Sequence, residues 1–338
     1  MTLCPSLPLR RPSTIAALLL AASPALLGAA PPSSAPAAVP AAAPVASATD
    51  PAAIPPFEVA ENKKIGVWFG RFGTTNCSWI DMGDGVAVID TGASEADAKN
   101  LLAQIAERTP GKTVRWVVLT HLHGDSNSGF SLFTGPDVTV FVHARSAEGT
   151  AAAIASISKS SRRAAVVGVS DRTVLATPKR RLELFASAGP AHTGADLAAY
   201  LADAGTMWVG DVVTPTRCPM TSDPQCDPSG WLAFLSTLEA QHPATIIATR
   251  GDATLDPAKE LDATKAYLTR LIEALSVFKA KNFPEARVSA ELSLGKIGEY
   301  CPAQLDAINA IAIYRRIGAD GKIVPAAGAA KDPKTPKK

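Results

Sequence analysis

The sequence predicts an α/β fold in which helices cover a sandwich of β-sheets, and three observations support this prediction. Short β-rich segments come first, helices and strands then alternate, and both kinds of segment recur in the second half of the 338-residue chain. Several of the predicted strands are continuous apolar runs, which is typical of strands buried on both faces. Apolar residues make up 47% of the chain, enough for a sizeable core. Sheets inside and helices outside are therefore expected.

The folded part begins with β-rich segments separated by Gly-containing turns, which predict a meander of strands. These segments are 65–72, 76–82 and 85–90. A helix is expected next, over 94–110. Ser94 can cap its start with Asp97 three residues further on, and Pro110 lies just past its end.

The remaining elements are strands buried in the sheets and one long helix. The strands are expected at 114–120, 138–143, 181–189, 197–202, 206–211 and 244–249. The Ala/Ser-rich stretch between the second and third of these strands shows no regular pattern. The long helix is predicted over 256–278, because Asp256 can cap it and Pro257 suits its first position.

The N-terminus has the pattern of a secretory signal peptide, assigned to residues 1–30. Arg10 and Arg11 precede a short apolar run at 14–30, and small residues follow it. The run is shorter than the roughly 20 residues of a membrane span. We therefore expect a periplasmic or secreted protein without a stable membrane anchor after signal cleavage.

The rest of the chain divides into three parts. Residues 31–56 are mostly Pro, Ala, Ser and Val, which predicts a semi-rigid linker. Residues 57–328 form one predicted domain, and residues 329–338 a disordered tail. The formal net charge of +2 does not indicate a nucleic-acid partner, so the expected partner is a small-molecule substrate.

Four cysteines remain outside the predicted signal peptide: Cys77, Cys218, Cys226 and Cys301. Export to an oxidising compartment allows disulfides. Cys218 and Cys226 lie in one loop and are the favoured pair, with Cys77 and Cys301 free or paired. Four unpaired thiols are the alternative.

A candidate metal site follows the predicted strand at 114–120. In an extended loop, residues two apart point the same way, so His121 and His123 can face one metal and Asp125 can reach in beside them. Two further candidate ligands are His192, on a Gly/Pro loop between strands, and Asp211, at the end of a strand. Imidazoles with carboxylates suit Zn²⁺ better than iron or manganese.

At these residues the chain resembles the metallo-β-lactamase superfamily. The motifs VIDTG (88–92), THLHGD (120–125), GPAHTGAD (189–196) and VGD (209–211) follow one another in that family's order. The resemblance implies an αββα sandwich of two mixed sheets with the metal site at one edge. It also implies roles for individual residues: a three-histidine site for His121, His123 and His192, second-site or bridging ligands for Asp125 and Asp211, and a supporting carboxylate for Asp90.

Two departures from the family pattern concern the second metal. Ser126 stands where the family often has a further histidine, and Arg250 stands where its last histidine commonly lies. A guanidinium is permanently charged and cannot bind a metal. We hypothesise that Arg250 pairs with Asp125 or Asp211 and replaces the charge of a second metal; the alternative is that it points into solvent. Of the other two histidines, His143 is expected to be structural, and His242 to lie at the surface or to serve in packing.

The predicted function is that of an exported, mononuclear zinc hydrolase. A metal-bound hydroxide would attack the carbonyl of a lactam, lactone or thioester, with Asp125 orienting the water or taking its proton. Specificity could reside in 144–176, where Arg162 and Arg163 would meet an anionic substrate or simply face water. Two alternatives stay open. One is a degenerate metal-binding protein without turnover, and the other is a mononuclear iron oxygenase that uses His121, His192 and Asp211.

Overall fold

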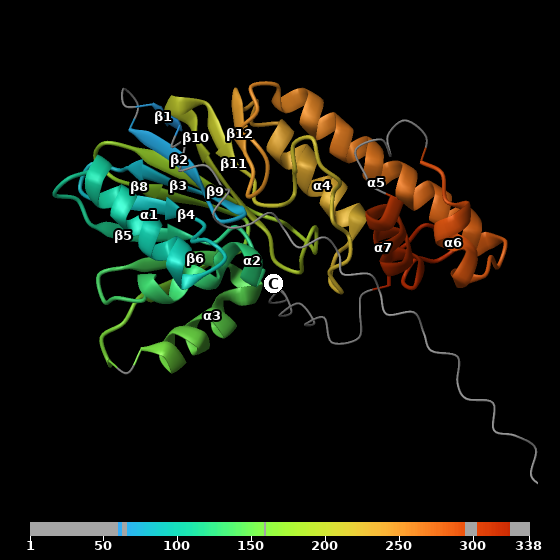
Figure 1. Cartoon of the computed structure of the whole chain (residues 1–338), viewed down its shortest axis with the longest axis horizontal. Coiled ribbons are helices and arrows are strands. Elements are labelled where there is room, and N and C mark those ends of the chain that lie inside the picture. The colour runs from blue at the N-terminus through green and yellow to red at the C-terminus, as the bar shows by residue number, and fades with distance from the viewer. Residues whose placement is uncertain (1–59, 63–65, 159, 295–302, 325–338) are drawn as a thin grey trace, which may run out of the picture. The chain divides into compact units, whose positions relative to one another are not determined.

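Two β-sheets pack face to face and carry helices on their outer surfaces in the computed structural model (Figure 1). The structure describes residues 60–62, 66–158, 160–294 and 303–324. The predicted signal peptide, linker and tail, like Cys4 and Cys301, lie outside these residues. Within the described part, no helix combines the length and apolarity that a membrane span requires.

The first sheet begins as the predicted meander and continues as parallel strands. Its order is β1 (Ala60–Asn62), β2 (Val67–Phe72), β3 (Thr75–Asp81), β4 (Val86–Ile89), β5 (Val114–Val118), β6 (Thr139–His143) and β7 (Ala165–Val169). The strands from β1 to β4 are antiparallel, and those from β4 to β7 are parallel. The C-terminal ends of the parallel strands therefore lie at one edge, where functional loops are commonly placed.

The second sheet is mostly antiparallel. Its order is β12 (Thr245–Ile247), β11 (Thr206–Trp208), β10 (Leu197–Leu201), β9 (Arg181–Ala186) and β8 (Arg172–Ala176). Only β11 and β12 run parallel to each other. Both sheets are therefore mixed, as predicted.

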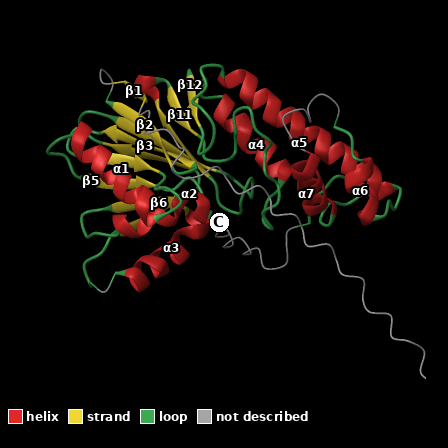
Figure 2. Cartoon of the chain, in the orientation of Figure 1, coloured by secondary structure: helices red, strands yellow, loops and turns green. Residues whose placement is uncertain are grey.

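Helices cover both outer faces of the sandwich (Figure 2). They are α1 (Glu95–Arg108), α2 (Gly124–Asn127), α3 (Ala144–Ile157), α4 (Pro228–Glu239), α5 (Pro257–Ala280), α6 (Glu285–Glu291) and α7 (Ala303–Tyr314). The core has three parts. One lies between the sheets, one joins the first sheet to α1 and α3, and one joins the second sheet to α4, α5 and α7.

The predicted caps are present at both long helices. The Ser94 side chain accepts a hydrogen bond from the Asp97 amide at the start of α1. Asp256 accepts one from the Lys259 amide at the start of α5, with Pro257 in the first helical position. Such caps satisfy backbone donors that have no partner inside the helix.

Several elements differ from the prediction. The irregular Ala/Ser-rich stretch contains α3, because its apolar face packs on β6 and β7 through Ile154. No range was predicted for β1, β7, β8, α2, α4, α6 or α7. β5 is also not buried throughout: Arg115, in its first half, is exposed and pairs with Asp84 at 3.0 Å.

Candidate metal centre

Three histidines converge at the edge of the sandwich. His121 and His123 follow β5, and His192 lies on the loop between β9 and β10. One ring nitrogen of each lies within 4.8 Å of those of the other two, and the ring centroids are 5.0–5.4 Å apart. The structure thus brings together the three imidazoles that the sequence suggested as ligands.

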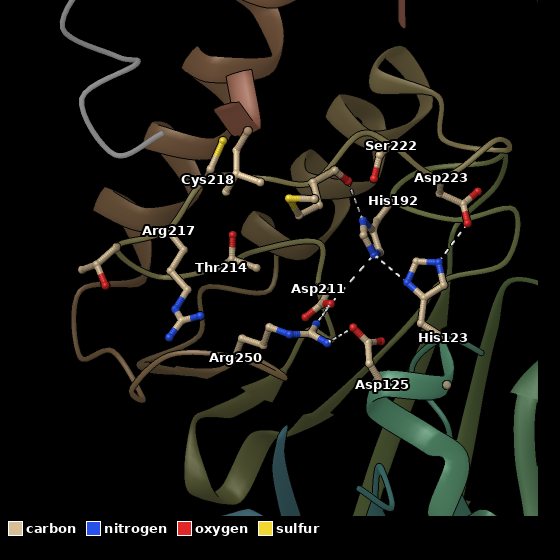
Figure 3. Close-up of a pocket in the computed structure, with 14 residues that line it drawn as sticks. His123, Asp125, His192, Asp211, Thr214, Arg217, Cys218, Ser222, Asp223 and Arg250 are labelled. Carbon is tan, nitrogen blue, oxygen red and sulfur yellow. Dashed lines mark hydrogen bonds and ion pairs between the residues drawn. The ribbon is translucent and has the colours of Figure 1, made fainter. Parts of the chain in front are cut away.

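Hydrogen bonds select the nitrogen that each of two histidines presents. His192 Nδ1 lies 3.0 Å from the carbonyl oxygen of Met220, which can only accept, so Nδ1 carries the proton. His123 Nε2 donates to the Asp223 carboxylate at 2.8 Å. His192 Nε2 and His123 Nδ1 therefore carry free lone pairs, and these two nitrogen atoms lie 3.3 Å apart (Figure 3). Such outer hydrogen bonds are typical of histidines that bind metals.

His121 presents its Nε2 in the same way. Its Nδ1 lies 3.0 Å from the Thr120 hydroxyl, and that hydroxyl donates to Asp90 at 2.8 Å. The hydroxyl oxygen therefore accepts from Nδ1–H, which leaves Nε2 unprotonated. This Nε2 atom is buried and has no hydrogen-bond partner. Burial, followed by the charges of His192 and His123, lowers the pKa of His121 well below its usual value. A neutral, buried, unpartnered nitrogen fits a metal ligand.

Asp90 supports His121 through the Thr120 hydroxyl, which donates to the Asp90 carboxylate. It has a positive φ of 57° and is 2% exposed. The Thr120 amide and the Asn127 side-chain amide each donate to it at 2.9 Å. Burial raises its pKa to about 6 despite these hydrogen bonds. The structure thus places Asp90 where it positions His121 through Thr120.

Asp211 approaches the histidines from the second sheet. Its Oδ2 atom lies 3.6 Å from His121 Nε2 and 3.9 Å from His192 Nε2, and the residue is 6% exposed. Gly210 precedes it with a φ of 61°, and a Cβ atom there would lie 2.8 Å from the Thr120 hydroxyl. A glycine is therefore required where the β11 loop passes the His121 support.

Arg250 pairs with both aspartates of the site. Its Nη1 donates to Asp211 Oδ2 and its Nη2 to Asp125 Oδ2 (Figure 3). The same Nη2 lies 3.5 Å from the hydroxyl of the buried Ser126. Arg250 thus does not point into solvent. Arg250 therefore joins the two aspartates and Ser126 into one polar group beside the three imidazoles.

The histidine cluster opens into a pocket of about 730 Å³. The lining includes His123, Asp125, His192, Asp211, Thr214, Thr216, Arg217, Cys218, Met220, Ser222, Asp223, Arg250 and Leu305. Most of the wall opposite the histidines comes from the segment after β11. No described residue of 144–176 lines this pocket, although Ser146 lines a neighbouring pocket that also contains His123 and Asp223. Arg162 and Arg163 are exposed. The residues of this stretch build α3, β7 and β8, and its role as a specificity region stays a prediction.

The predicted pairing of Cys218 with Cys226 is also wrong. Cys226 is a free, fully buried thiol, and Cys77 is likewise free and buried. Cys218, by contrast, is disulfide-bonded. Proximity along one loop suggested the pair, but Cys226 is directed into the core beside α4.

The two remaining histidines lie outside the cluster. His143 caps α3, accepts from the Arg145 amide and bonds the carbonyl of Ser187 at 2.9 Å. His242 is exposed in the turn after α4. Both positions agree with the roles expected for them.

Sequence reasoning missed two groups that shape the site. Asp223 and the Met220 carbonyl hold His123 and His192 from a loop with no recognisable motif. An acidic residue between two cysteines was the only signal for Asp223. A backbone carbonyl leaves no trace in the sequence at all.

Comparison with solved structures places this fold among known proteins. A metallo-beta-lactamase from Pontibacter korlensis is 21% identical with a TM-score of 0.51, over 63% of this chain and 99% of that one. TMB-1 is 17% identical with a TM-score of 0.52, over 64% and 99%. The inverting sec-alkylsulfatase Pisa1 from Pseudomonas sp. is 15% identical with a TM-score of 0.60. This match covers 78% of the chain but only 50% of Pisa1.

At these identities the similarity shows the fold alone. No match was found among curated protein sequences. The family model of the metallo-beta-lactamase superfamily, however, matches residues 70–250, which is more than half of the chain and includes every candidate site residue named above except those of the C-terminal helices. The chain belongs to the metallo-beta-lactamase superfamily.

Proposed function

We propose that the protein is a mononuclear zinc-dependent hydrolase that acts on the carbonyl group of a small molecule. The observation that carries this proposal is the convergence of His121 Nε2, His123 Nδ1 and His192 Nε2, each freed by a hydrogen bond at its other ring nitrogen. Three imidazoles form a donor set that suits a catalytic zinc ion. When bound, zinc supplies a Lewis acid that makes water a nucleophile near neutral pH.

The mononuclear part of the proposal rests on Arg250. Its guanidinium contacts both carboxylates that would otherwise serve a second cation. A permanent positive charge repels a cation at short range, and it needs no metal to balance Asp125 and Asp211. Ser126 offers only a hydroxyl in place of an imidazole.

The carboxylates have separate tasks in this scheme. Asp211 is buried and its carboxylate lies within 4 Å of the Nε2 atoms of His121 and His192, so it places a negative charge beside these two rings. The Asp125 side chain is 65% exposed and borders the pocket, so it can orient the attacking water or take its proton. Arg250 holds both in place, which limits the reorganisation needed during reaction.

The size and lining of the pocket support a small-molecule substrate. Its volume of about 730 Å³ suits a small molecule, and its lining combines Thr214, Ser222 and Arg217 with the apolar Met220 and Leu305. Lactams, lactones and thioesters present the carbonyl that such a site attacks. One of the structures above is named a metallo-beta-lactamase, which makes β-lactams one option within this class.

We place the protein in the periplasm or outside the cell. The signal-peptide pattern of residues 1–30 supports this, and so does the disulfide at Cys218, because disulfides persist in oxidising compartments. Cell fractionation and N-terminal sequencing of the mature protein test it. A cytosolic protein that retains residues 1–30 would contradict it.

The metal content of the purified protein, measured by mass spectrometry beside His121→Ala, tests the function. We expect about one zinc per chain, loss of it in the variant, and turnover in a screen of lactams, lactones and thioesters. Two zincs per chain would contradict the mononuclear site. Iron would favour oxidation chemistry, and no metal after reconstitution would favour a protein without turnover.

A further inference from the structure

One loop supplies the outer hydrogen bonds of two of the three candidate metal ligands. We call residues 214–226 the pocket loop. Its Met220 carbonyl accepts from His192 Nδ1 at 3.0 Å, and its Asp223 carboxylate accepts from His123 Nε2 at 2.8 Å. The position of this loop therefore decides the orientation of both rings. His121, by contrast, is held from the first sheet through Thr120.

The pocket loop contains no helix or strand, so something else must hold it in place. Its middle part is fastened to α7 by the buried side chain of Asn309. Asn309 Oδ1 accepts from the Thr221 amide at 2.9 Å, and Nδ2 donates to the Pro219 carbonyl at 2.7 Å. These two contacts enclose Met220. The Thr221 hydroxyl adds a bond to the Asn309 backbone carbonyl at 3.2 Å.

Asn309 is itself tightly fixed. It is 0% exposed, and its Nδ2 also donates to the Tyr267 hydroxyl of α5 at 2.9 Å. That hydroxyl in turn donates to Asp306 of α7 at 2.9 Å. A fully hydrogen-bonded, buried amide of this kind specifies one geometry, because any displacement leaves buried polar groups unpaired.

The anchor lies outside the region that defines the family. The superfamily match ends at residue 250, whereas α5 and α7 follow it. α7 also contributes Leu305 to the pocket wall. The C-terminal helices are therefore connected to the histidine cluster by a continuous set of hydrogen bonds through the pocket loop.

We propose that Asn309 is a positioning residue for the metal centre, acting on His123 and His192 through the pocket loop; this rests on the proposed function in so far as that function requires a metal. Without the Asn309 side chain, the Thr221 amide and the Pro219 carbonyl lose their partners, which loosens the segment that carries Met220 and Asp223. The bond from the Thr221 hydroxyl to the backbone of residue 309 remains. Both rings can then turn away from the geometry that binds a metal. Loss of outer hydrogen bonds typically lowers metal affinity by about 10- to 100-fold.

The test compares zinc affinity in full-length protein, measured by competition with a chromophoric chelator. Asn309→Ala is the test variant. Ile313→Ala is the matched control, because Ile313 lies one turn further along α7, is 0% exposed and belongs to the core without contacting the pocket loop through a hydrogen bond. We expect Asn309→Ala to lower zinc affinity by about 10-fold or more. Ile313→Ala should lower the melting temperature and leave zinc affinity within about 2-fold.

A double-mutant cycle with Asp223→Ala tests the route of the effect. If Asn309 acts through the pocket loop, Asp223→Ala should cost less zinc affinity in the Asn309→Ala background than in the wild type, because coupled residues are not additive. Hydrogen exchange of the metal-free protein should show faster exchange of the Thr221 amide in Asn309→Ala only. Should Asn309→Ala not fold, Asn309→Asp replaces it, since it keeps the acceptor and loses the donor to Pro219.

The outcomes separate this proposal from the function on which it rests. A wild-type chain that binds no zinc overturns the proposed function and this proposal together. A wild-type chain that binds zinc, with equal affinities in Asn309→Ala and Ile313→Ala, overturns only the positioning role. Additive losses in the cycle do the same.

Discussion

The ion pair between Asp211 and Arg250 is a consequence of strand register. β11 and β12 are parallel neighbours in which Trp208 is paired with Ile247. Asp211 and Arg250 each lie three residues beyond these partners, so the two side chains emerge together at one edge of the sheet. The backbone bond from the Thr249 amide to the Gly210 carbonyl, at 2.9 Å, extends the alignment to that point. The pair therefore belongs to the sandwich itself.

Restoring two imidazoles should create a second metal site. In Arg250→His combined with Ser126→His, Asp125 and Asp211 lose their guanidinium partner and gain histidines beside them. We expect zinc content to rise from about one to about two ions per chain, measured by mass spectrometry.

Arg250→Lys is the control for this experiment, because it keeps the charge and adds no ligand at neutral pH; it should bind one zinc. A double variant that still binds one zinc would show that something other than Arg250 and Ser126 excludes the second ion.

His192 should be essential for metal binding, whereas His242 should not. Removing His192 takes away one of three converging nitrogens, so the loss of zinc affinity in His192→Ala should exceed the roughly 100-fold expected for an outer-shell partner. His242→Ala removes an exposed histidine and should bind zinc as the wild type does. Isothermal titration of both variants measures this; equal affinities would mean that the metal lies elsewhere.

Asp90 should make the metal-free protein less stable as pH rises from about 4 to about 6. Burial raises its pKa in the folded state from 3.8 to about 6, so in this window the folded state binds more protons than the unfolded state. The free energy of unfolding therefore falls with rising pH, by up to about 3 kcal/mol for a shift of this size. In Asp90→Asn this part of the pH dependence should disappear.

Urea unfolding of both proteins at pH 4.5 and pH 7, with chelator present, measures the difference. The wild type should lose more stability than Asp90→Asn between the two values. Identical changes would mean that Asp90 is ionised throughout this range.

Arg217 should contribute to binding of anionic substrates, and Arg162 should not. Arg217 lines the pocket, whereas Arg162 is exposed on a segment that does not. An exposed charge pair contributes about 0.2–1 kcal/mol, so Arg217→Ala should raise KM for an anionic carbonyl substrate by up to about 5-fold. Steady-state kinetics of Arg217→Ala and Arg162→Ala decide this. A larger increase of KM in Arg162→Ala than in Arg217→Ala would show that 144–176 contributes to substrate specificity.

Cys77 and Cys226 should resist alkylation until the protein unfolds. Both thiols are buried, and burial raises the pKa of each well above its usual value, which disfavours the reactive thiolate. Peptide mapping after iodoacetamide treatment should find both unmodified in the folded protein and both modified in urea without reductant. Cys218 should stay unmodified in both. Alkylated Cys218 in unreduced protein would exclude its disulfide.

The fold class and the candidate ligands could be predicted from the sequence, because both depend largely on local patterns. Apolar runs separated by turns define buried strands, and caps such as Ser94 and Asp256 define helix starts. Histidines two residues apart after a buried strand predict a site at a strand end. The ion pairs of Arg250 could be proposed because the family resemblance puts Arg250 in the place of a metal-binding histidine, and a guanidinium pairs with carboxylates instead of binding a metal.

The surroundings of those ligands could not be predicted from the sequence, because they come from segments that are distant along the chain. The choice of ring nitrogen depends on Met220 and Asp223, which approach His192 and His123 from 28 and 100 residues away along the chain. The hydrogen bonds of Asn309 depend on how α7 packs beside the pocket loop. The sequence of α7 does not indicate that this amide side chain is buried. Cys218 and Cys226 lie close in sequence, yet they are not paired, because sidechain direction is set by packing. Such contacts arise between distant segments, and local propensities carry no information about them.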